Sequence, residues 1–129
     1  MKRVWLPRGA LVAALAGIAW LSLRPVGDST LDRAVAACGN GYLHLPAYAV
    51  LAGLFIGVLG RTPRRILASG IAAAAYGWLL EVAQRAVPTR HFNLRGLALD
   101  AAGAAFACLA ALAVRAVVAR RSARRRGAA

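Results

Sequence analysis

Apolar residues fill four long stretches of the chain, and charged residues are confined to the segments between and beyond them. Three of these stretches contain no Asp, Glu, Lys or Arg, and the fourth contains only Asp100. The stretches cover residues 9–23, 34–60, 66–80 and 96–114. A helix needs about 20 apolar residues to cross a hydrocarbon core roughly 30 Å thick. With flanking residues included, the pattern predicts transmembrane helices at approximately 6–23, 43–60, 66–84 and 96–117.

The fold class follows from what these stretches lack. A helix of a soluble bundle keeps a polar stripe on its solvent face, and these four show none, so a soluble alanine-rich bundle is disfavoured. We predict an all-α protein, a single integral membrane domain over residues 1–129 with a basic tail at 118–129. The first stretch could instead be a cleavable signal peptide, but Arg24 and Pro25 follow it where a small-residue cleavage site would stand. We therefore expect a retained first span.

Basic residues set the expected orientation. The chain has 17 Lys and Arg against 4 Asp and Glu, a net charge of +13. Four spans place both termini and the 61–65 turn on one side, which then carries most cations and no acid. Basic residues concentrate on the cytoplasmic side of membrane proteins. We therefore expect a multi-pass protein of the cell membrane with both termini cytoplasmic.

The arginine-rich tail, RRSARRR at 120–126, has three interpretations. Nucleic-acid binding would need stacking aromatics or a fold that presents the charges, and the tail has neither, so we expect no nucleic-acid partner. Attraction to anionic lipid is physically sound. A topology anchor after the last span explains the tail fully. A GxxxG pattern at Gly53 and Gly57 also leaves a homo-oligomer open.

A polar constellation interrupts the apolar pattern where residues 81–100 read EVAQRAVPTRHFNLRGLALD. Glu81 and Gln84 share a face near the end of the third expected helix. Asp100 lies about a turn inside the fourth helix, and His44 begins the second. An antiparallel bundle brings these ends together, with Arg90 in the connecting loop. The sequence therefore predicts a polar pocket at one end of the bundle.

The two carboxylates need partners if they lie inside the span. An ionised carboxylate there costs a few kcal/mol unless it is paired. We expect Arg90 to pair with Glu81, and Arg95, Arg90 or His44 to pair with Asp100. The alternative is that both acids reach the interface and only mark helix ends.

Other chemistries find little support in the sequence. No helical His/Glu motif indicates a metal, and we expect no cofactor. Cys38 and Cys108 should lie at different depths, which disfavours a disulfide. Ser69 should lie at the far end of the third helix and Cys108 too deep, so no serine or cysteine nucleophile is expected in the pocket.

Several residues of the constellation stand at characteristic spacings: His44 with Tyr48, Glu81-x-x-Gln84, Pro88-x-Arg90, Phe92 and Gly103. Over about residues 40–105, this pattern resembles the VanZ-like family, membrane proteins related to one associated with teicoplanin resistance. The resemblance implies an envelope-related membrane role, such as glycopeptide resistance, and no particular reaction.

The chain departs from the family pattern at several positions. Asn40 and Gly41 stand where the family has Asp-Lys, Gly96 replaces a loop Asp, and Asp100 replaces a helical Asn. One interpretation is that the acid has moved from 96 to 100, one turn along the same helix face. The other is that the site is altered or lost.

Two functional hypotheses follow. In the first, the protein is an accessory or binding protein at the outer leaflet, acting on membrane lipids or a lipid-linked envelope precursor. Arg90 and Arg85 would hold an anionic head group, with Gln84 and His44 as hydrogen-bonding residues.

In the second hypothesis, the protein is an intramembrane enzyme acting on a lipid-linked substrate. Glu81 or Asp100 would be the general base, His44 the acid and Arg90 an anion clamp. A third possibility is a structural membrane protein whose polar residues only cap its helices.

Overall fold

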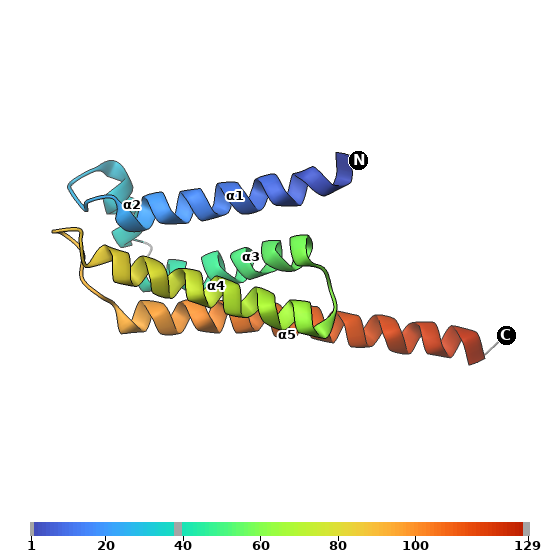
Figure 1. Cartoon of the computed structure of the whole chain (residues 1–129). Coiled ribbons are helices and arrows are strands. Elements are labelled where there is room, and N and C mark those ends of the chain that lie inside the picture. Colours follow the sequence, from blue (N-terminus) through green and yellow to red (C-terminus); the bar gives the residue numbers. More distant parts are fainter. Residues whose placement is uncertain (1, 38–39, 128–129) are drawn as a thin grey trace.

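The computed structural model describes residues 2–37 and 40–127, and the regular secondary structure within them is all helical (Figure 1). Its helices are α1 Lys2–Leu23, α2 Thr30–Ala37, α3 Asn40–Leu59, α4 Pro63–Gln84 and α5 Leu94–Gly127. In α1, α3, α4 and α5, the length and apolar composition suffice to cross a membrane. The predicted all-α class and the four transmembrane helices are therefore confirmed.

Helix α2 was not predicted. It begins after Ser29, whose hydroxyl oxygen accepts the backbone N–H of Asp32 at 3.1 Å. A serine at this position satisfies an otherwise unpaired amide of the first helical turn. Part of the segment between the first two spans is thus a short helix.

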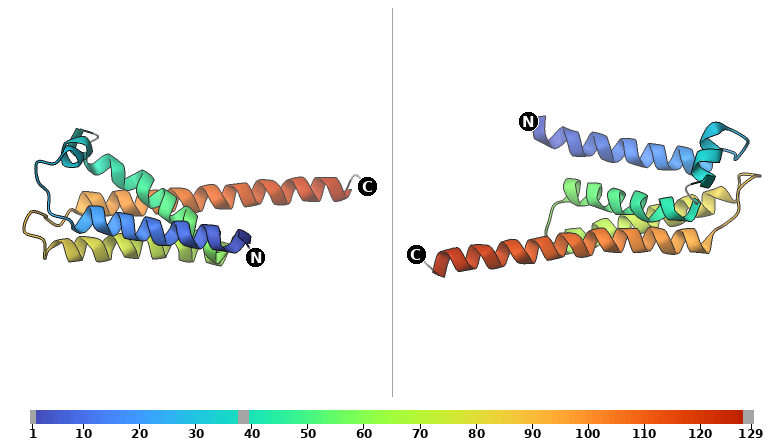
Figure 2. Two further views of the ribbon diagram at one scale, coloured as in Figure 1. Left: turned by 90° about the horizontal axis from the view of Figure 1, so that it is seen from above. Right: turned by 180° about the vertical axis from the view of Figure 1, so that it is seen from behind.

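Helix α5 extends further than expected, continuing to Gly127 instead of ending near residue 117. The basic tail is helical because alanine and arginine are both strong helix formers, and no proline or glycine interrupts them before Gly127. Figure 2 shows this extension projecting beyond the other helices.

The helices form an up-and-down bundle with two distinct ends. The N-terminus, the α3–α4 turn and the C-terminal part of α5 lie at one end, here called the basic end (Figures 1 and 2). The 24–29 linker, α2 and the α4–α5 loop lie at the other, here called the loop end. Helices α3, α4 and α5 pack against one another, and α1 packs on α3 and α4.

The α3–α4 turn is short because its residues stop one helix and start the next. Gly60 has a φ of 106°, a left-handed conformation that favours glycine at a helix C-terminus. Thr62 then caps α4, and Pro63 occupies its first turn. Helix α4 therefore begins three residues earlier than predicted.

Small residues let the helices approach closely. A Cβ atom on Gly103 of α5 would overlap the carbonyl oxygen of Leu45 and lie 3.1 Å from the backbone nitrogen of Ala49, both on α3. Gly53 has no such neighbour within 4 Å, so the GxxxG pattern does not make the tight contact. Backbone proximity at Gly103 instead fixes α5 against α3, as small residues do in membrane bundles.

Candidate functional site

A pocket of about 550 Å³ lies at the loop end, among α1, α2, α3, α4 and the α4–α5 loop. Five of the residues singled out in the sequence line it: His44, Tyr48, Glu81, Gln84 and Arg90. The structure thus brings these side chains together at the loop end, whereas Asp100 does not line the pocket.

His44 and Asp100 form the polar centre behind the pocket wall. His44 Nδ1 lies 2.8 Å from Asp100 Oδ1, and the Asp100 residue is 1% exposed. Gly77 leaves room for this carboxylate, since a Cβ atom there would lie 2.7 Å from Asp100 Oδ2. Of the three expected partners of Asp100, the structure selects His44, and Arg95 is exposed. With Nδ1 engaged by a carboxylate, Nε2 is the ring nitrogen available to a ligand.

Glu81 is buried and held by the backbone. Its Oε2 accepts the N–H of Asn93 at 2.8 Å, and the residue is 2% exposed. The Asn93 side chain in turn accepts the N–H of Gly96 at 3.1 Å, which fixes the start of α5. The expected ion pair between Glu81 and Arg90 is not formed. Both residues line the pocket, but the loop directs Arg90 toward α1.

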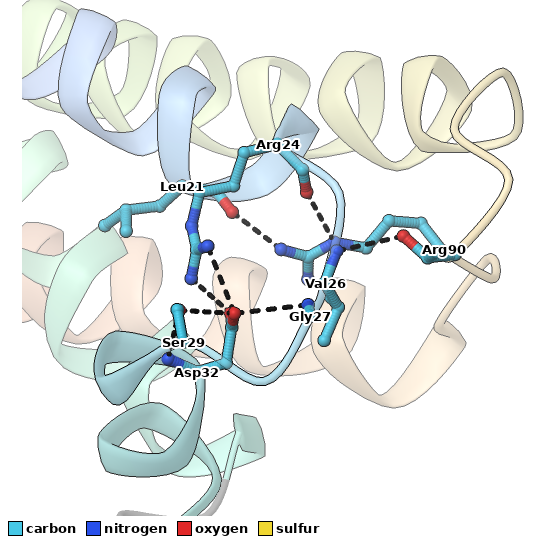
Figure 3. Close-up of polar contacts among 8 residues, drawn as sticks. Leu21, Arg24, Val26, Gly27, Ser29, Asp32 and Arg90 are labelled. Atoms are coloured by element: carbon cyan, nitrogen blue, oxygen red, sulfur yellow. Dashed lines mark hydrogen bonds and ion pairs between the residues drawn. The ribbon is translucent and has the colours of Figure 1, made fainter.

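Arg90 binds the C-terminal end of α1 (Figure 3). Its Nη2 donates to the carbonyl oxygen of Leu21 at 2.8 Å, and its Nε donates to that of Arg24 at 3.3 Å. The last carbonyls of a helix have no partner within the helix, and a cation stabilises them. Nearby, the Thr89 hydroxyl accepts the N–H of Val26 at 2.9 Å. Burial lowers the pKa of Arg90, and an arginine remains charged nonetheless.

The 24–29 linker is closed by a second group of contacts, here called the linker clasp, formed by Arg24, Gly27, Ser29 and Asp32 (Figure 3). Asp32 forms an ion pair with Arg24 and accepts the N–H of Gly27 at 3.2 Å. The Ser29 hydroxyl, and then Arg24, hold the pKa of Asp32 well below its usual range. A carboxyl whose pKa is lowered in the folded state stabilises that state at pH values above its ordinary pKa of about 4. This contribution to stability is lost as the pH falls toward the lowered pKa. The linker clasp therefore stays charged at neutral and mildly acidic pH.

Arg24 presents an unpaired donor at the pocket wall. Its Nε is buried and has no hydrogen-bond partner among the described residues, while its terminal nitrogens bind Asp32. A buried donor left unpaired costs about 1–3 kcal/mol. Arg24 therefore keeps one hydrogen-bonding group that no described residue satisfies.

Two other candidates lie elsewhere. Arg85 does not line the pocket, because its guanidinium stacks on the Phe92 ring, 4.6 Å from the centroid. Asp100 does not line the pocket either, although its hydrogen-bond partner His44 does. Arg85 is thus placed to hold the α4–α5 loop and not a ligand.

The serine and cysteine residues differ in part from expectation. Ser22 of α1 lines the pocket, although no serine was expected there. It was missed because only the position of α1 against α3 and α4 brings it in. Ser69 donates to the Arg65 carbonyl and Cys108 to the Ile66 carbonyl, both away from the pocket. Cys38 lies outside the described residues.

Positions 96 and 100 both adjoin His44. A Cβ atom on Gly96 would lie 3.1 Å from His44 Cε1, so an acid at either position could reach the imidazole. The same Cβ would lie 3.3 Å from Glu81 Oε1 and 3.1 Å from Asn93 Nδ2. Moving the acid back to 96 would therefore crowd it against a second carboxylate. The Asn40 side chain lies outside the described part of the chain, and Gly41 has no side chain.

Within residues 2–37 and 40–127, no group of three or more His, Cys, Asp or Glu side chains is arranged to hold a metal ion. No family model, curated protein or solved structure matches the chain. The pocket itself is therefore the feature from which a function can be inferred.

Proposed function

We propose that this multi-pass membrane protein binds an amphiphile with an anionic head group, a membrane lipid or a lipid-linked envelope precursor, in the loop-end pocket. The observation that supports this is a pocket lined by Arg24 and Arg90 together with apolar side chains of membrane-spanning helices. The envelope-related accessory role implied by the resemblance to VanZ-like proteins, with glycopeptide resistance as one form, is part of the same proposal.

The pocket wall divides into two chemical halves. Ile18 and Leu21 of α1, with Leu43 and Ala47 of α3, supply apolar surface at the membrane-spanning depth. Ligand sites commonly pair such a surface with a few placed polar groups. An acyl or isoprenoid segment is therefore suited to this half.

The polar half fits a head group that carries both a phosphate and neutral polar groups. Asp32 already neutralises Arg24, so Arg90 supplies the net positive charge of the α1 side. Arginine binds phosphate through paired N–H groups. Glu81 and Gln84 line the opposite side and accept hydrogen bonds from hydroxyl, amide or amine groups. This combination fits a sugar- or peptide-bearing phospholipid better than a simple anion.

The test compares lipids that remain bound after purification, measured by mass spectrometry. Arg90→Gln removes one charged donor set and is expected to reduce the retained phosphate-containing amphiphile about tenfold, since a charge-assisted hydrogen bond contributes about 1.5–3 kcal/mol. Arg85→Gln is the matched control, because it removes the same charge outside the pocket, and retention should stay at the wild-type level. Arg90→Lys keeps the cation and should recover part of the loss. Equal retention in Arg90→Gln and wild type would refute the proposal.

A second candidate function is acid–base chemistry on the bound amphiphile, and the His44–Asp100 contact favours it. A carboxylate on Nδ1 orients an imidazole and raises its basicity, as in other His-carboxylate pairs. Asp100 would then position His44, and would not itself be the base, because it does not line the pocket. Turnover of the bound lipid during incubation, lost in His44→Gln, would distinguish this function from binding alone.

We propose further that the basic end faces the cytoplasm, which places the pocket at the outer leaflet. Reporter fusions after Arg65 and Ala129 are expected to report the cytoplasm. Fusions after Arg33 and Asn93 should report the opposite side. A cytoplasmic signal from Asn93 would reverse the orientation and move the pocket to the inner leaflet.

A further inference from the structure

A second hollow, of about 450 Å³, runs between α3 and α5 at the basic end and is here called the basic-end groove. Most of its wall is apolar and built from small side chains of α5 facing Gly53 and Ile56 of α3. Arg61 and Arg115 line the same groove. It shares no residue with the loop-end pocket.

The apolar and the cationic residues of the groove occupy different positions along the direction of the helices. On α5, Ala107 and Arg115 are eight positions apart, which corresponds to about 12 Å along the helix. On the other wall, Gly53 and Ile56 lie within α3, and Arg61 lies in the turn that follows it. Arg115 Nη1 donates to the carbonyl oxygen of Arg61 at 3.2 Å, so the two arginines lie at one level. That level is the α3–α4 turn, where two spans end. The groove is therefore apolar over most of its length, and its two cations lie beside the α3–α4 turn.

The two arginines have no internal counter-charge. Within the described residues, the ion pairs are Arg24–Asp32 and His44–Asp100, both toward the loop end. Arg61 and Arg115 are exposed, and the part of α5 beyond them carries five more arginines and no acid. An anion bound here must come from outside the chain.

A second copy of the chain does not supply that anion. A copy inserted with the same orientation brings its own basic end to this level, and like charges repel. The chain's four acids are Asp28, Asp32, Glu81 and Asp100, all in elements of the loop end or beside it. The charge pattern therefore favours an occupant that is apolar along most of its length and negative at one end.

We propose that the basic-end groove binds one anionic phospholipid, with an acyl chain along the α3–α5 hollow and its phosphate between Arg61 and Arg115. Anionic lipids attract cationic side chains near the membrane surface, and each Lys or Arg there contributes appreciably to lipid binding. This site is independent of the proposed function at the loop end. It would fix α5 against α3 at the point where α5 leaves the membrane.

The experiment is native mass spectrometry of the full chain in detergent, titrated with phosphatidylglycerol or with phosphatidylcholine of the same acyl chains. Wild type is expected to retain one phosphatidylglycerol about tenfold more tightly than phosphatidylcholine. Arg61→Gln combined with Arg115→Gln should abolish that preference. The control, Arg121→Gln with Arg125→Gln, removes the same charge from the projecting part of α5 and should keep it.

A second variant tests the apolar part of the site. Ala110→Leu with Ala111→Leu fills the groove without changing charge, and should weaken retention of both lipids. Equal loss of preference in the two arginine pairs would overturn the proposal, since it would show only a diffuse attraction to α5. A dimer peak that Ala110→Leu and Ala111→Leu remove would also overturn it, because the groove would then hold a second copy.

Discussion

Replacing Gly103 with alanine is expected to push α5 away from α3 and to destabilise the bundle by about 1–3 kcal/mol or more. The added methyl group would overlap the Leu45 carbonyl oxygen and lie 3.0 Å from the Leu45 carbonyl carbon. Both atoms belong to helical backbone, which cannot move aside as a side chain can. The loss should appear as a lower thermal midpoint in detergent, followed by far-UV circular dichroism.

Gly17→Ala is the control for this substitution. It lies in a membrane-spanning helix, and its added methyl would meet nothing within 4 Å. Helix propensity favours alanine over glycine by about 1 kcal/mol, so this variant should be neutral or slightly stabilised. If Gly103→Ala melts like Gly17→Ala, the close approach of α3 and α5 is not as described. Because His44 and Asp100 lie on these two helices, the same substitution should also disturb the contact behind the pocket.

Asp100 and His44 are expected to show strong thermodynamic coupling in a double-mutant cycle. Removing one partner of a buried ion pair leaves the charge of the other uncompensated, which can lower the free energy of unfolding by about 3–5 kcal/mol. The pair Asp100→Asn and His44→Gln should therefore give a coupling energy of about 0.5–3 kcal/mol in the free energy of unfolding. The measurement is denaturation of each single and the double variant in mixed detergent micelles.

Glu81 and Arg90 provide the contrasting cycle. They line the same pocket but have different partners, the Asn93 amide and the α1 carbonyls. Glu81→Gln and Arg90→Gln should therefore be nearly additive, although the sequence suggested an ion pair. Strong coupling between Glu81 and Arg90, together with additivity for Asp100 and His44, would contradict this structure. It would mean that Glu81 pairs with Arg90 and that Asp100 does not pair with His44.

Much of the fold could be predicted from sequence because the membrane imposes a simple pattern. Long stretches with no charge or a single one identified all four spans. The antiparallel arrangement then brought His44, Glu81, Gln84 and Arg90 to one end. Helix α2 escaped notice because it depends on a single capping hydroxyl and on the Arg24–Asp32 contact. The helical tail was missed because its charges obscured its high helix propensity.

The choice of partners inside the site could not be predicted in the same way. Sequence spacing placed Arg90 near Glu81, but the path of the α4–α5 loop and the free carbonyls of α1 decided where its guanidinium binds. Arg85 neighbours Gln84 in sequence, yet stacking on Phe92 keeps it out of the pocket. Ser22 enters only through the packing of α1. Each of these depends on tertiary geometry that residue type and spacing do not encode.

The most direct test of the proposed function is site-specific photocrosslinking in native membranes, with a diazirine amino acid of leucine-like size at Leu43, which lines the loop-end pocket. The control carries the same group at Leu109, on the exposed surface of α5 outside both hollows. Mass spectrometry of the adducts should show one phosphate-containing amphiphile enriched about tenfold at Leu43 over its share of the bulk membrane, and bulk composition at Leu109. Bulk composition at both positions would contradict the account, since the pocket would then hold no selected ligand.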